Sequence, residues 1–524
     1  MRFFNTAGPN DSQRHYTLPP LERLDLDEML MLIDQQKYFV LHAPRQTGKT
    51  TCLLALRDHL NGTGSHRSVY TNVEVAQSAR EDVAAAMQAI LAQLGSWAEG
   101  EGDNFVATAW PKVLERHGPH AALGEVLTRW AGADPRPLVL LIDEIDALVG
   151  DTLISVLRQL RAGYPRRPRQ FPQSVILCGV RDVRDYRIHS SAEKSVITGG
   201  SAFNIKAESL RLGDFIEPKV RSLYDQHTQE TGQIFEPAAL ERLWELGQGQ
   251  PWLTSALGYE VCFKSKAGRN RSRPIGRELV NEAKENLILR RETHLDQLID
   301  KLQEERVRRV IEPLLVGSEE AERIPGDDLQ YVQDLGLIKI DRQVYISNPI
   351  YQEVIPRELV YSETVTLTQP TSWYLRTDGT LDLSRLLGAF QQFFREHSEH
   401  WVERFQYKEA GPQLLLQAFL QRVVNGGGRI EREYGLGRMR TDLLVLWPYE
   451  GGVQKEVIEL KLLHRSLKQT LATGLEQTWQ YLDRCGAGEG HLVIFDRTPG
   501  KPWEEKLFCR SETLRGRTLT VWGM

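Results

Sequence analysis

Between Lys37 and about Pro218, short apolar runs alternate with segments whose apolar residues recur at helical spacing. Strands that alternate with helices favour a parallel sheet with helices on both faces. We therefore expect residues 1–215 to form an α/β domain. The predicted strands are Tyr38–His42, Ser68–Val73, Pro137–Ile142 and Ser174–Gly179, and the predicted helices include Asp82–Leu94 and Leu153–Leu160.

Two smaller regions follow this domain. Residues 216–300 combine apolar positions at helical spacing with many charges, which predicts a helical domain. Residues 301–360 predict two helices and then two short strands, which is the order expected of a winged helix-turn-helix. These helices are Val307–Leu315 and Asp327–Leu335, and the strands are Leu337–Ile340 and Val344–Ser347. Residues 361–374 are rich in threonine and predict a linker.

Residues 375–524 predict a second α/β domain, because helical and strand patterns are again mixed. The predicted helices are Leu381–Phe394, Pro412–Val424 and Leu471–Leu482, and the predicted strands are Arg440–Leu446, Val457–Lys461 and His491–Phe495.

The composition excludes several classes of protein. With 41% hydrophobic and 26% charged residues, the chain can bury hydrophobic cores, and general disorder is excluded. The formal net charge of -5 gives no global case for nucleic-acid binding, so such binding would need a local basic patch. The five cysteines lack zinc or disulfide spacing, and no apolar stretch has signal-peptide or membrane-helix length. We therefore expect a cytoplasmic protein without a membrane segment.

A glycine-containing loop follows the first predicted strand of the α/β domain and opens a helix, which is the context that a P-loop requires. Backbone N–H groups at such a helix start surround phosphate oxygens. Lys49 is expected to reach the β- and γ-phosphates of ATP, and the Thr50 hydroxyl to ligate Mg²⁺. The first position is alanine rather than glycine, which is tolerated where φ stays negative. The candidate nucleotide-binding residues are Ala43, Arg45, Gln46, Thr47, Gly48, Lys49 and Thr50.

A second acidic motif supports the nucleotide site. The apolar run Leu138–Ile142 ends in Asp143 and Glu144, which predicts one carboxylate for Mg²⁺ and one to polarise the attacking water. An acidic strand end without this role is the alternative, and the upstream P-loop argues against it. We expect Asp146 to cap a helix.

Further candidates surround this site. Arg181, Arg184 and Arg187 follow the strand Ser174–Gly179, and Arg181 is the best placed to sense the γ-phosphate, although surface arginines are the alternative. Tyr16 and Arg23 are candidates to flank the adenine, and packing of Tyr16 against the domain is the alternative. The chain lacks the Asn-Lys-x-Asp guanine motif, which favours ATP over GTP.

The P-loop, the Asp-Glu pair and the arginine resemble the AAA-like, archaeal-type ATPases near the STAND class. Gly249–Pro251 resembles the GxP motif of that class, and Asp334–Ile338 with Ile346–Ile350 resembles its winged-helix segment. The resemblance covers residues 1–360. It implies a nucleotide-gated switch whose lid and winged helix report the phosphate state, and it implies a homo-oligomer.

The last domain carries a second set of carboxylates. Glu459 and Lys461 alternate along one predicted strand and therefore share a face. A hairpin-like pairing with the strand that contains Asp442 would bring the three side chains together. Asp442 and Glu459 could hold a divalent cation, and Lys461 could orient a water that attacks phosphorus. A solvated strand face is the alternative for Glu-Leu-Lys alone.

The order of these residues resembles the PD-(D/E)XK nuclease superfamily, with Thr441 in place of the proline. The resemblance covers roughly residues 375–500. It implies that Asp442 and Glu459 are metal ligands and that Lys461 is catalytic. Glu409 would be an accessory acid, and Gln477 and Tyr481, four apart on one helix face, would support the substrate.

Taken together, these features predict an ATP-controlled, Mg²⁺-dependent nuclease: an ATPase domain, a helical lid, a winged helix and an α/β/α nuclease-like domain that binds nucleic acid, with DNA favoured. By family analogy its role is the control of foreign or mobile nucleic acid. One alternative is a regulatory ATPase whose nuclease-like domain only binds. Another is an ATP-dependent DNA-binding regulator, against which the acidic helix Asp327–Asp334 argues.

Overall fold

The computed structural model describes residues 1–182, 187–190, 195–198, 203–290, 295, 300–302, 304–316, 324–355, 373–405, 416, 419–420, 428–436, 439–463, 466–496, 498 and 501–524. The chain divides into two compact units. The first comprises Met1–Leu298 and Pro325–Tyr351, and the second comprises Ile299–Ile324 and Gln352–Met524.

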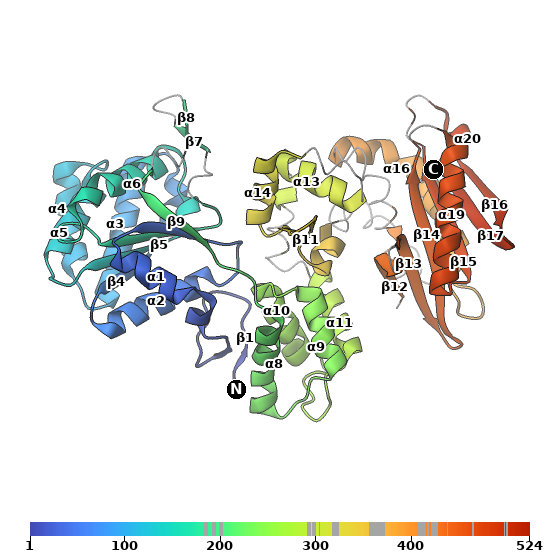
Figure 1. Cartoon of the computed structure of the whole chain (residues 1–524), viewed down its shortest axis with the longest axis horizontal. Helices are drawn as coiled ribbons and strands as arrows, with labels where there is room; N and C mark the ends of the chain where they lie inside the picture. Colours follow the sequence, from blue (N-terminus) through green and yellow to red (C-terminus); the bar gives the residue numbers. More distant parts are fainter. Residues whose placement is uncertain are drawn as a thin grey trace. The chain divides into compact units, whose positions relative to one another are not determined.

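The first unit is built on a five-stranded sheet (Figure 1). Its strands are all parallel, in the order β4-β5-β6-β3-β9. They are β3 (Tyr38–His42), β4 (Arg67–Asn72), β5 (Leu138–Asp143), β6 (Ser174–Gly179) and β9 (Lys206–Arg211). The four predicted strands are confirmed, and each is buried along nearly its whole length. Burial on both faces explains the apolar runs of β3, β5 and β6, whereas β4 has apolar residues only at its centre, Val69 and Tyr70. The edge strand β9 was not predicted.

Helices cover both faces of this sheet, as predicted (Figure 1). Successive strand residues point to opposite faces. Phe39 and Val139 therefore pack with α1 and α2, whereas Val40 and Leu140 pack with α3 to α6. The helices are α1 (Leu26–Asp34), α2 (Lys49–Thr63), α3 (Val83–Gly100), α4 (Phe105–His117), α5 (Ala122–Gly132) and α6 (Gly150–Gly163).

The region predicted as a helical lid completes this part of the first unit. It is helical, with α8 (Glu217–Thr231), α9 (Pro237–Gly247), α10 (Pro251–Tyr259) and α11 (Arg277–Leu289), and its role as a lid stays a prediction. The N-terminal segment packs onto the lid through two short parallel strands, β1 (Phe3–Phe4) and β2 (His15–Tyr16). The Phe4 ring lies 5.4 Å from the Tyr224 ring, and the Tyr16 hydroxyl lies 3.2 Å from His227 Nδ1. The first residues of the chain are thus part of the lid core.

The predicted winged-helix region contributes to both units. Helix α14 (Gly326–Asp334) and the antiparallel strands β10 (Ile338–Ile340) and β11 (Val344–Ile346) belong to the first unit. Helix α13 (Glu305–Val316) is grouped with the second. The predicted order of two helices and a hairpin is present, and the assignment as a winged helix stays a prediction.

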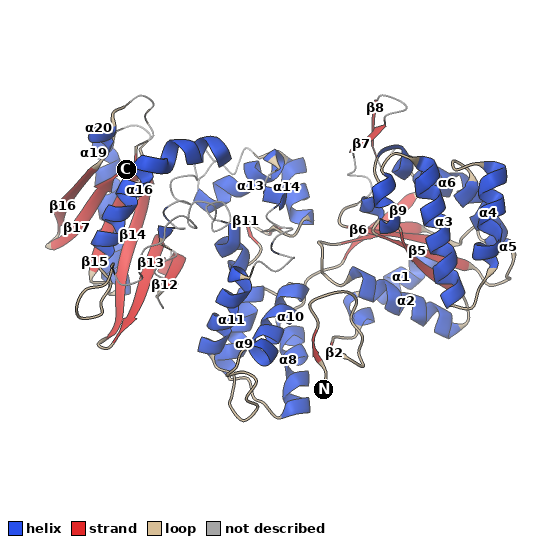
Figure 2. Cartoon of the chain, turned by 180° about the vertical axis from the view of Figure 1, so that it is seen from behind, coloured by secondary structure: helices blue, strands red, loops and turns tan. Residues whose placement is uncertain are grey.

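The second unit contains a six-stranded mixed sheet in the order β12-β13-β14-β15-β17-β16. Helix α19 (Leu467–Cys485) packs on Leu492 and Ile494 of β15, and Figure 2 shows it lying along the strands. Helix α16 (Leu383–Phe405) contacts Phe495, the next residue of β15, so the two helices cover opposite faces. The strands are β12 (Arg429–Leu436), β13 (Met439–Tyr449), β14 (Gly452–Leu462), β15 (Glu489–Phe495), β16 (Phe508–Leu514) and β17 (Arg517–Gly523), and a short helix, α20 (Trp503–Lys506), precedes β16.

This layered arrangement agrees with the predicted order of the last domain in outline. The strands predicted around Asp442, Glu459 and His491 are present, and β12, β16 and β17 were not predicted. The predicted helix Pro412–Val424 lies almost entirely outside the described residues.

Candidate nucleotide site and a second carboxylate site

The loop between β3 and α2 has the backbone shape of a phosphate-binding loop. Gln46 and Gly48 have φ of 56° and 88° and lie in the left-handed region. A Cβ added to Gly48 would approach Arg23 Nη1 to 2.8 Å, so glycine is favoured there for space as well as for conformation. Ala43 does not have a positive φ, which is the condition under which alanine can replace glycine at the first position.

Lys49 lies at the centre of this loop and is buried, with 4% of its surface exposed. Its Nζ donates to the carbonyl oxygens of Ala43 at 3.0 Å and of Pro44 at 3.1 Å. The Thr47 hydroxyl donates to the same Pro44 oxygen at 2.8 Å. The loop is therefore folded around an ammonium group, while the side chains of Arg45 and Gln46 point to the surface and are exposed.

Asp143 joins the end of β5 to the start of α2. Its Oδ2 accepts hydrogen bonds from the Thr50 hydroxyl at 2.7 Å and from the Tyr70 hydroxyl at 3.0 Å, and its Oδ1 accepts from the Glu144 amide at 3.0 Å. The carboxylate is completely buried, and no lysine or arginine of the described residues forms an ion pair with it. A buried negative charge favours a cation, and oxygen donors suit Mg²⁺. Thr50 and Asp143 therefore fit a magnesium site.

Glu144 has an unusual backbone conformation. Its φ of 56° and ψ of 42° place a residue other than glycine in the left-handed region, a strained state that is frequent at functional sites. Burial raises the pKa of the Glu144 carboxyl, and the charge of Lys49 opposes this shift. A partly desolvated carboxylate that interacts with the loop lysine is suited to accept a proton from water.

The expected helix-capping role of Asp146 is wrong. Its Oδ1 accepts from the Val180 amide at 3.1 Å, just after β6, and the residue that precedes α6 is Val149. The Asp146 side chain therefore ties the end of β5 to the end of β6, because the loop after β5 turns back towards the sheet before α6 begins.

Arg181, two residues after β6, is engaged by helix α14. Its Nε lies 3.4 Å from Asp334 Oδ2, and its guanidinium lies 4.8 Å from the centre of the Tyr331 ring. Asp334 is 1% exposed, and its other oxygen accepts from Gln330 at 2.9 Å. Arg184 lies outside the described residues, as does the side chain of Arg187. Of the three candidate arginines, Arg181 is the one with described side-chain contacts.

The same end of α14 lies against the phosphate loop. A Cβ added to Gly336, which has φ of 80°, would approach Pro44 to 2.8 Å. Arg211 of β9 donates to the Gln333 carbonyl oxygen at 2.9 Å. The end of α14 and the residues just after it therefore contact both the phosphate loop and strand β9.

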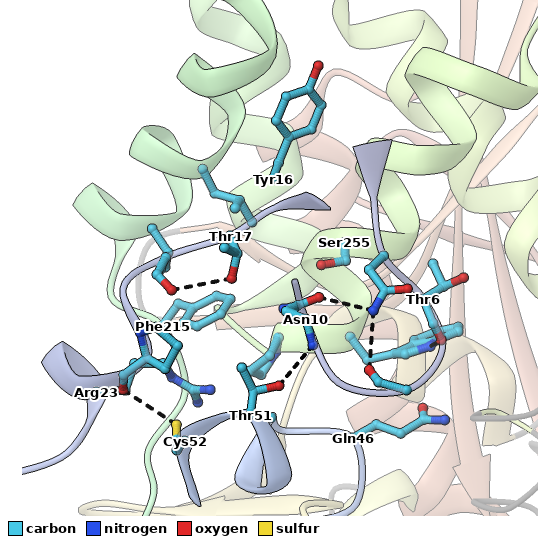
Figure 3. A pocket seen from close by; sticks show the side chains of 18 of the residues that line it. Thr6, Asn10, Tyr16, Thr17, Arg23, Gln46, Thr51, Cys52, Phe215 and Ser255 are labelled. Carbon is cyan, nitrogen blue, oxygen red and sulfur yellow. Dashed lines mark hydrogen bonds between the residues drawn. The ribbon is translucent and has the colours of Figure 1, made fainter. Parts of the chain in front are cut away.

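A pocket opens beside the loop, between the N-terminal segment, α2 and the lid (Figure 3). Tyr16 and Arg23 both line it, together with Thr51, Phe215 and Trp252. It directly adjoins Gly48, so a base and sugar placed there would continue from a triphosphate on the loop.

Arg23 lines this pocket and contacts both the phosphate loop and the segment before the lid. Its Nη1 donates to the Thr47 carbonyl oxygen at 2.5 Å, its Nη2 donates to the Gly213 carbonyl oxygen at 2.9 Å, and its guanidinium lies 4.7 Å from the Phe215 ring centre. Burial lowers the pKa of Arg23. Across the pocket, the Asn10 amide donates to the Thr51 hydroxyl at 3.0 Å, as Figure 3 shows.

Sequence reasoning missed Tyr70 and Asp334. Tyr70 lies within an apolar run, and Asp334 belongs to a distant segment. Neither residue has a local motif that could have revealed its contact.

The second unit contains the other predicted carboxylate site. Strands β13 and β14 form the expected antiparallel hairpin, with Leu444 opposite Val457 and Leu443 opposite Ile458. The next positions along the ladder are 442 and 459. The side chain of Asp442 lies outside the described part of the structure, and so does Glu409. Glu459 is buried, and its Oε1 accepts from Lys461 Nζ at 2.7 Å.

Helix α19 brings its polar residues towards Glu459. Since α19 connects the parallel strands β14 and β15, it runs back against both. Tyr481 packs in the cluster that contains Val457. Glu459 lies two residues beyond Val457, about 6.6 Å along a strand. Gln477 lies one turn, about 6 Å, before Tyr481. Gln477 is therefore level with Glu459, and among the described residues its buried Oε1 has no hydrogen-bond partner.

A buried histidine and two glutamates lie on the opposite face of this sheet and were not predicted. Ligand atoms of Glu456, Glu489 and His491 lie within 4.8 Å of one another. His491 Nδ1 accepts from the Trp522 indole at 3.3 Å, so its proton is on Nε2, which lies 3.2 Å from Glu456 Oε2. A metal on Nε2 would need the proton on Nδ1, facing the indole N–H. The arrangement fits a hydrogen-bond network better than a metal site.

Comparison with known proteins agrees with the fold and the loop geometry. Residues 33–186 match a family model described as "AAA domain". This range contains the phosphate loop together with Asp143 and Glu144. The first unit therefore contains a P-loop ATPase domain of the AAA type. No match is found among curated proteins.

Three solved structures show the extent of the similarity. The Walker-type ATPase paby2304 of Pyrococcus abyssi is 14% identical and covers 67% of this chain and 99% of its own, with a TM-score of 0.44. Cdc6p from Pyrobaculum aerophilum is 14% identical and covers 69% of this chain and 96% of its own, with a TM-score of 0.35. RuvB from Thermotoga maritima is 14% identical and covers 66% of this chain and 94% of its own, with a TM-score of 0.33. Within the described ranges, no helix combines the length and apolar character needed to cross a membrane.

Proposed function

We propose that the chain is an ATP-driven switch that binds and hydrolyses Mg·ATP at the 43–50 loop. The observation that carries this proposal is the convergence of buried Lys49, the Thr50 hydroxyl and buried Asp143. Lys49 would exchange its two carbonyl partners for phosphate oxygens. Thr50 and Asp143 would hold the magnesium ion, which neutralises phosphate charge when bound. Glu144 would orient and deprotonate water, and the pocket beside Arg23 would receive the base and sugar.

The loop lysine provides the test of this site. Replacing Lys49 with alanine removes the one buried cation of the loop, and we expect ATP affinity to fall on the order of 100-fold, or about 3 kcal/mol. Equilibrium titration with a fluorescent ATP analogue measures this change. Lys112→Ala, which removes an exposed lysine of α4, serves as the control. Equal affinity in both variants would show that the nucleotide does not bind at this loop.

We also propose that α14 restrains Arg181 and thereby links the nucleotide to the rest of the chain. A γ-phosphate on the loop would compete with Asp334 for this guanidinium, so nucleotide state and α14 docking would be coupled. The contact between Gly336 and Pro44 would also couple the conformation of the phosphate loop to the docking of α14.

Asp334→Asn is expected to weaken this restraint without changing side-chain size. We expect ATP turnover to rise roughly fivefold, within the usual range of coupling energies, and thermal stability to fall because a buried partner of Arg181 is lost. Phosphate release and thermal unfolding measure the two effects. Asp341→Asn changes an exposed carboxylate of the same segment and should leave both unchanged. Unchanged or slower turnover in Asp334→Asn would mean that the contact between Arg181 and Asp334 does not slow ATP hydrolysis.

For the second unit, we propose a Mg²⁺-dependent phosphodiesterase that acts on nucleic acid, with DNA favoured. The support is the hairpin register, the ion pair between buried Glu459 and partly buried Lys461, and the buried amide oxygen of Gln477 at the same level. Oxygen donors at this depth fit a divalent ion, which would stabilise negative charge on a scissile phosphate. Glu459, with Asp442 of the adjacent strand, would hold the ion, and Lys461 would orient the attacking water. Glu409 would be an accessory acid, and Gln477 and Tyr481 of α19 would support the substrate.

A second candidate function is a regulatory ATPase whose last domain binds nucleic acid or protein without cleaving it. A DNA-reading role for α14 is disfavoured, because this helix carries three aspartates and no basic residue, and its end is occupied by Arg181. We propose a homo-oligomer and a role against foreign or mobile nucleic acid from the family resemblance alone.

A further inference from the structure

Tyr70 is a buried tyrosine whose hydroxyl reaches the proposed magnesium site. It lies on β4, paired with Leu141 of β5, so its side chain shares the sheet face of Asp143, two residues further along. The hydroxyl donates to Asp143 Oδ2 at 3.0 Å. The ring is 2% exposed and is held edge-on by Trp97 of α3, with 4.7 Å between ring centres.

The orientation of Asp143 depends on few hydrogen bonds. The terminal torsion of an aspartate is intrinsically broad, so hydrogen bonds must fix the carboxylate plane. The Glu144 amide holds Oδ1, while the Thr50 and Tyr70 hydroxyls share Oδ2. The buried Cys178 thiol of β6 also hydrogen-bonds this carboxylate, but a thiol is a weak donor. Thr50 is itself a proposed metal ligand, whereas Tyr70 lies outside the phosphate loop. Tyr70 is thus the hydroxyl donor that can hold Asp143 independently of the bound nucleotide.

We propose that Tyr70 is a positioning residue for magnesium: its hydroxyl, supported by Trp97, fixes the Asp143 carboxylate in the orientation that receives Mg·nucleotide. This inference rests on the proposed nucleotide function. It adds a residue from a neighbouring strand that the loop and strand-end motifs do not include. Groups that orient a metal ligand typically change metal affinity or activity by about 10–100-fold when removed.

The test separates metal binding from nucleotide binding in the full chain. The affinity for a fluorescent ADP analogue is measured in EDTA and across a magnesium titration, for wild type, Tyr70→Phe and Tyr38→Phe. Tyr38 is a matched control, because it is a fully buried tyrosine of β3 whose hydroxyl donates to the Pro172 carbonyl oxygen at 3.0 Å. Both variants lose one buried hydrogen bond, and only Tyr70 contacts Asp143.

We expect Tyr70→Phe to need about tenfold more magnesium for half-maximal enhancement, about 1.4 kcal/mol, with affinity in EDTA unchanged. Tyr38→Phe should retain the wild-type magnesium requirement. If Tyr70→Phe folds poorly, Tyr70→Leu at equal folded fraction must show the same increase. A wild-type magnesium requirement in a folded Tyr70 variant, or an equal increase in Tyr38→Phe, overturns the inference. Absence of magnesium-dependent binding in the wild type would instead refute the nucleotide function and this inference with it.

Discussion

Glu144→Gln is expected to retain bound ATP and to hydrolyse it about 10²–10⁴-fold more slowly than the wild type, the usual contribution of a general base. Glutamine has nearly the size of glutamate but cannot accept a proton from water. The residue is partly buried beside the charge of Lys49, so its carboxylate is placed to act on a water near the phosphates. Single-turnover hydrolysis of labelled ATP, with binding measured in parallel, separates the chemical step from affinity.

The matched control for this experiment is Glu74→Gln, which changes an exposed carboxylate just after β4. It should hydrolyse ATP at the wild-type rate. Equal turnover in Glu144→Gln and wild type would show that another group activates the water. Loss of ATP binding in Glu144→Gln would instead indicate that the left-handed backbone at this position had changed.

The second large effect is expected in the C-terminal domain. Glu459→Gln and Lys461→Ala should each reduce cleavage of DNA or RNA on the order of 10³-fold, because one removes a metal-binding charge and the other the group that orients water. Release of labelled fragments with magnesium or manganese measures the loss, with ATP present and absent.

Glu456→Gln is the control for these variants. Glu456 lies three residues before Glu459 on β14, is equally buried, and faces His491 on the other side of the sheet. It should lower stability yet retain cleavage. If wild type, Glu459→Gln and Lys461→Ala are equally inert on every substrate, the nuclease function is wrong, and the domain acts by binding alone.

The strands that could be predicted from the sequence are those whose buried side chains form a run of apolar residues. Strands β3, β5 and β6 are covered on both faces and read as largely apolar runs. Strand β4 is also buried, but only Val69 and Tyr70 at its centre are apolar. The edge strand β9 has only partly buried or exposed positions and carries lysine, glutamate and arginine. Its sequence, like that of β16, resembles a polar connection because none of its positions is fully buried.

The candidate site was predictable only where it is encoded in consecutive residues. Lys49 and Thr50 share one loop, and Asp143 and Glu144 share one strand end, so local patterns reveal them. The Tyr70 and Asp334 contacts join segments far apart in the chain and depend on strand order and on docking of α14. The contact of Asp146 with Val180 was missed for the same reason.

The most direct test of the central claim is calorimetric titration of the full-length wild-type chain with ATP, in excess magnesium and in EDTA. The geometry of Lys49, Thr50 and Asp143 predicts one ATP per chain, bound more tightly with magnesium than without it. No binding, or the same affinity in magnesium and in EDTA, would contradict the account.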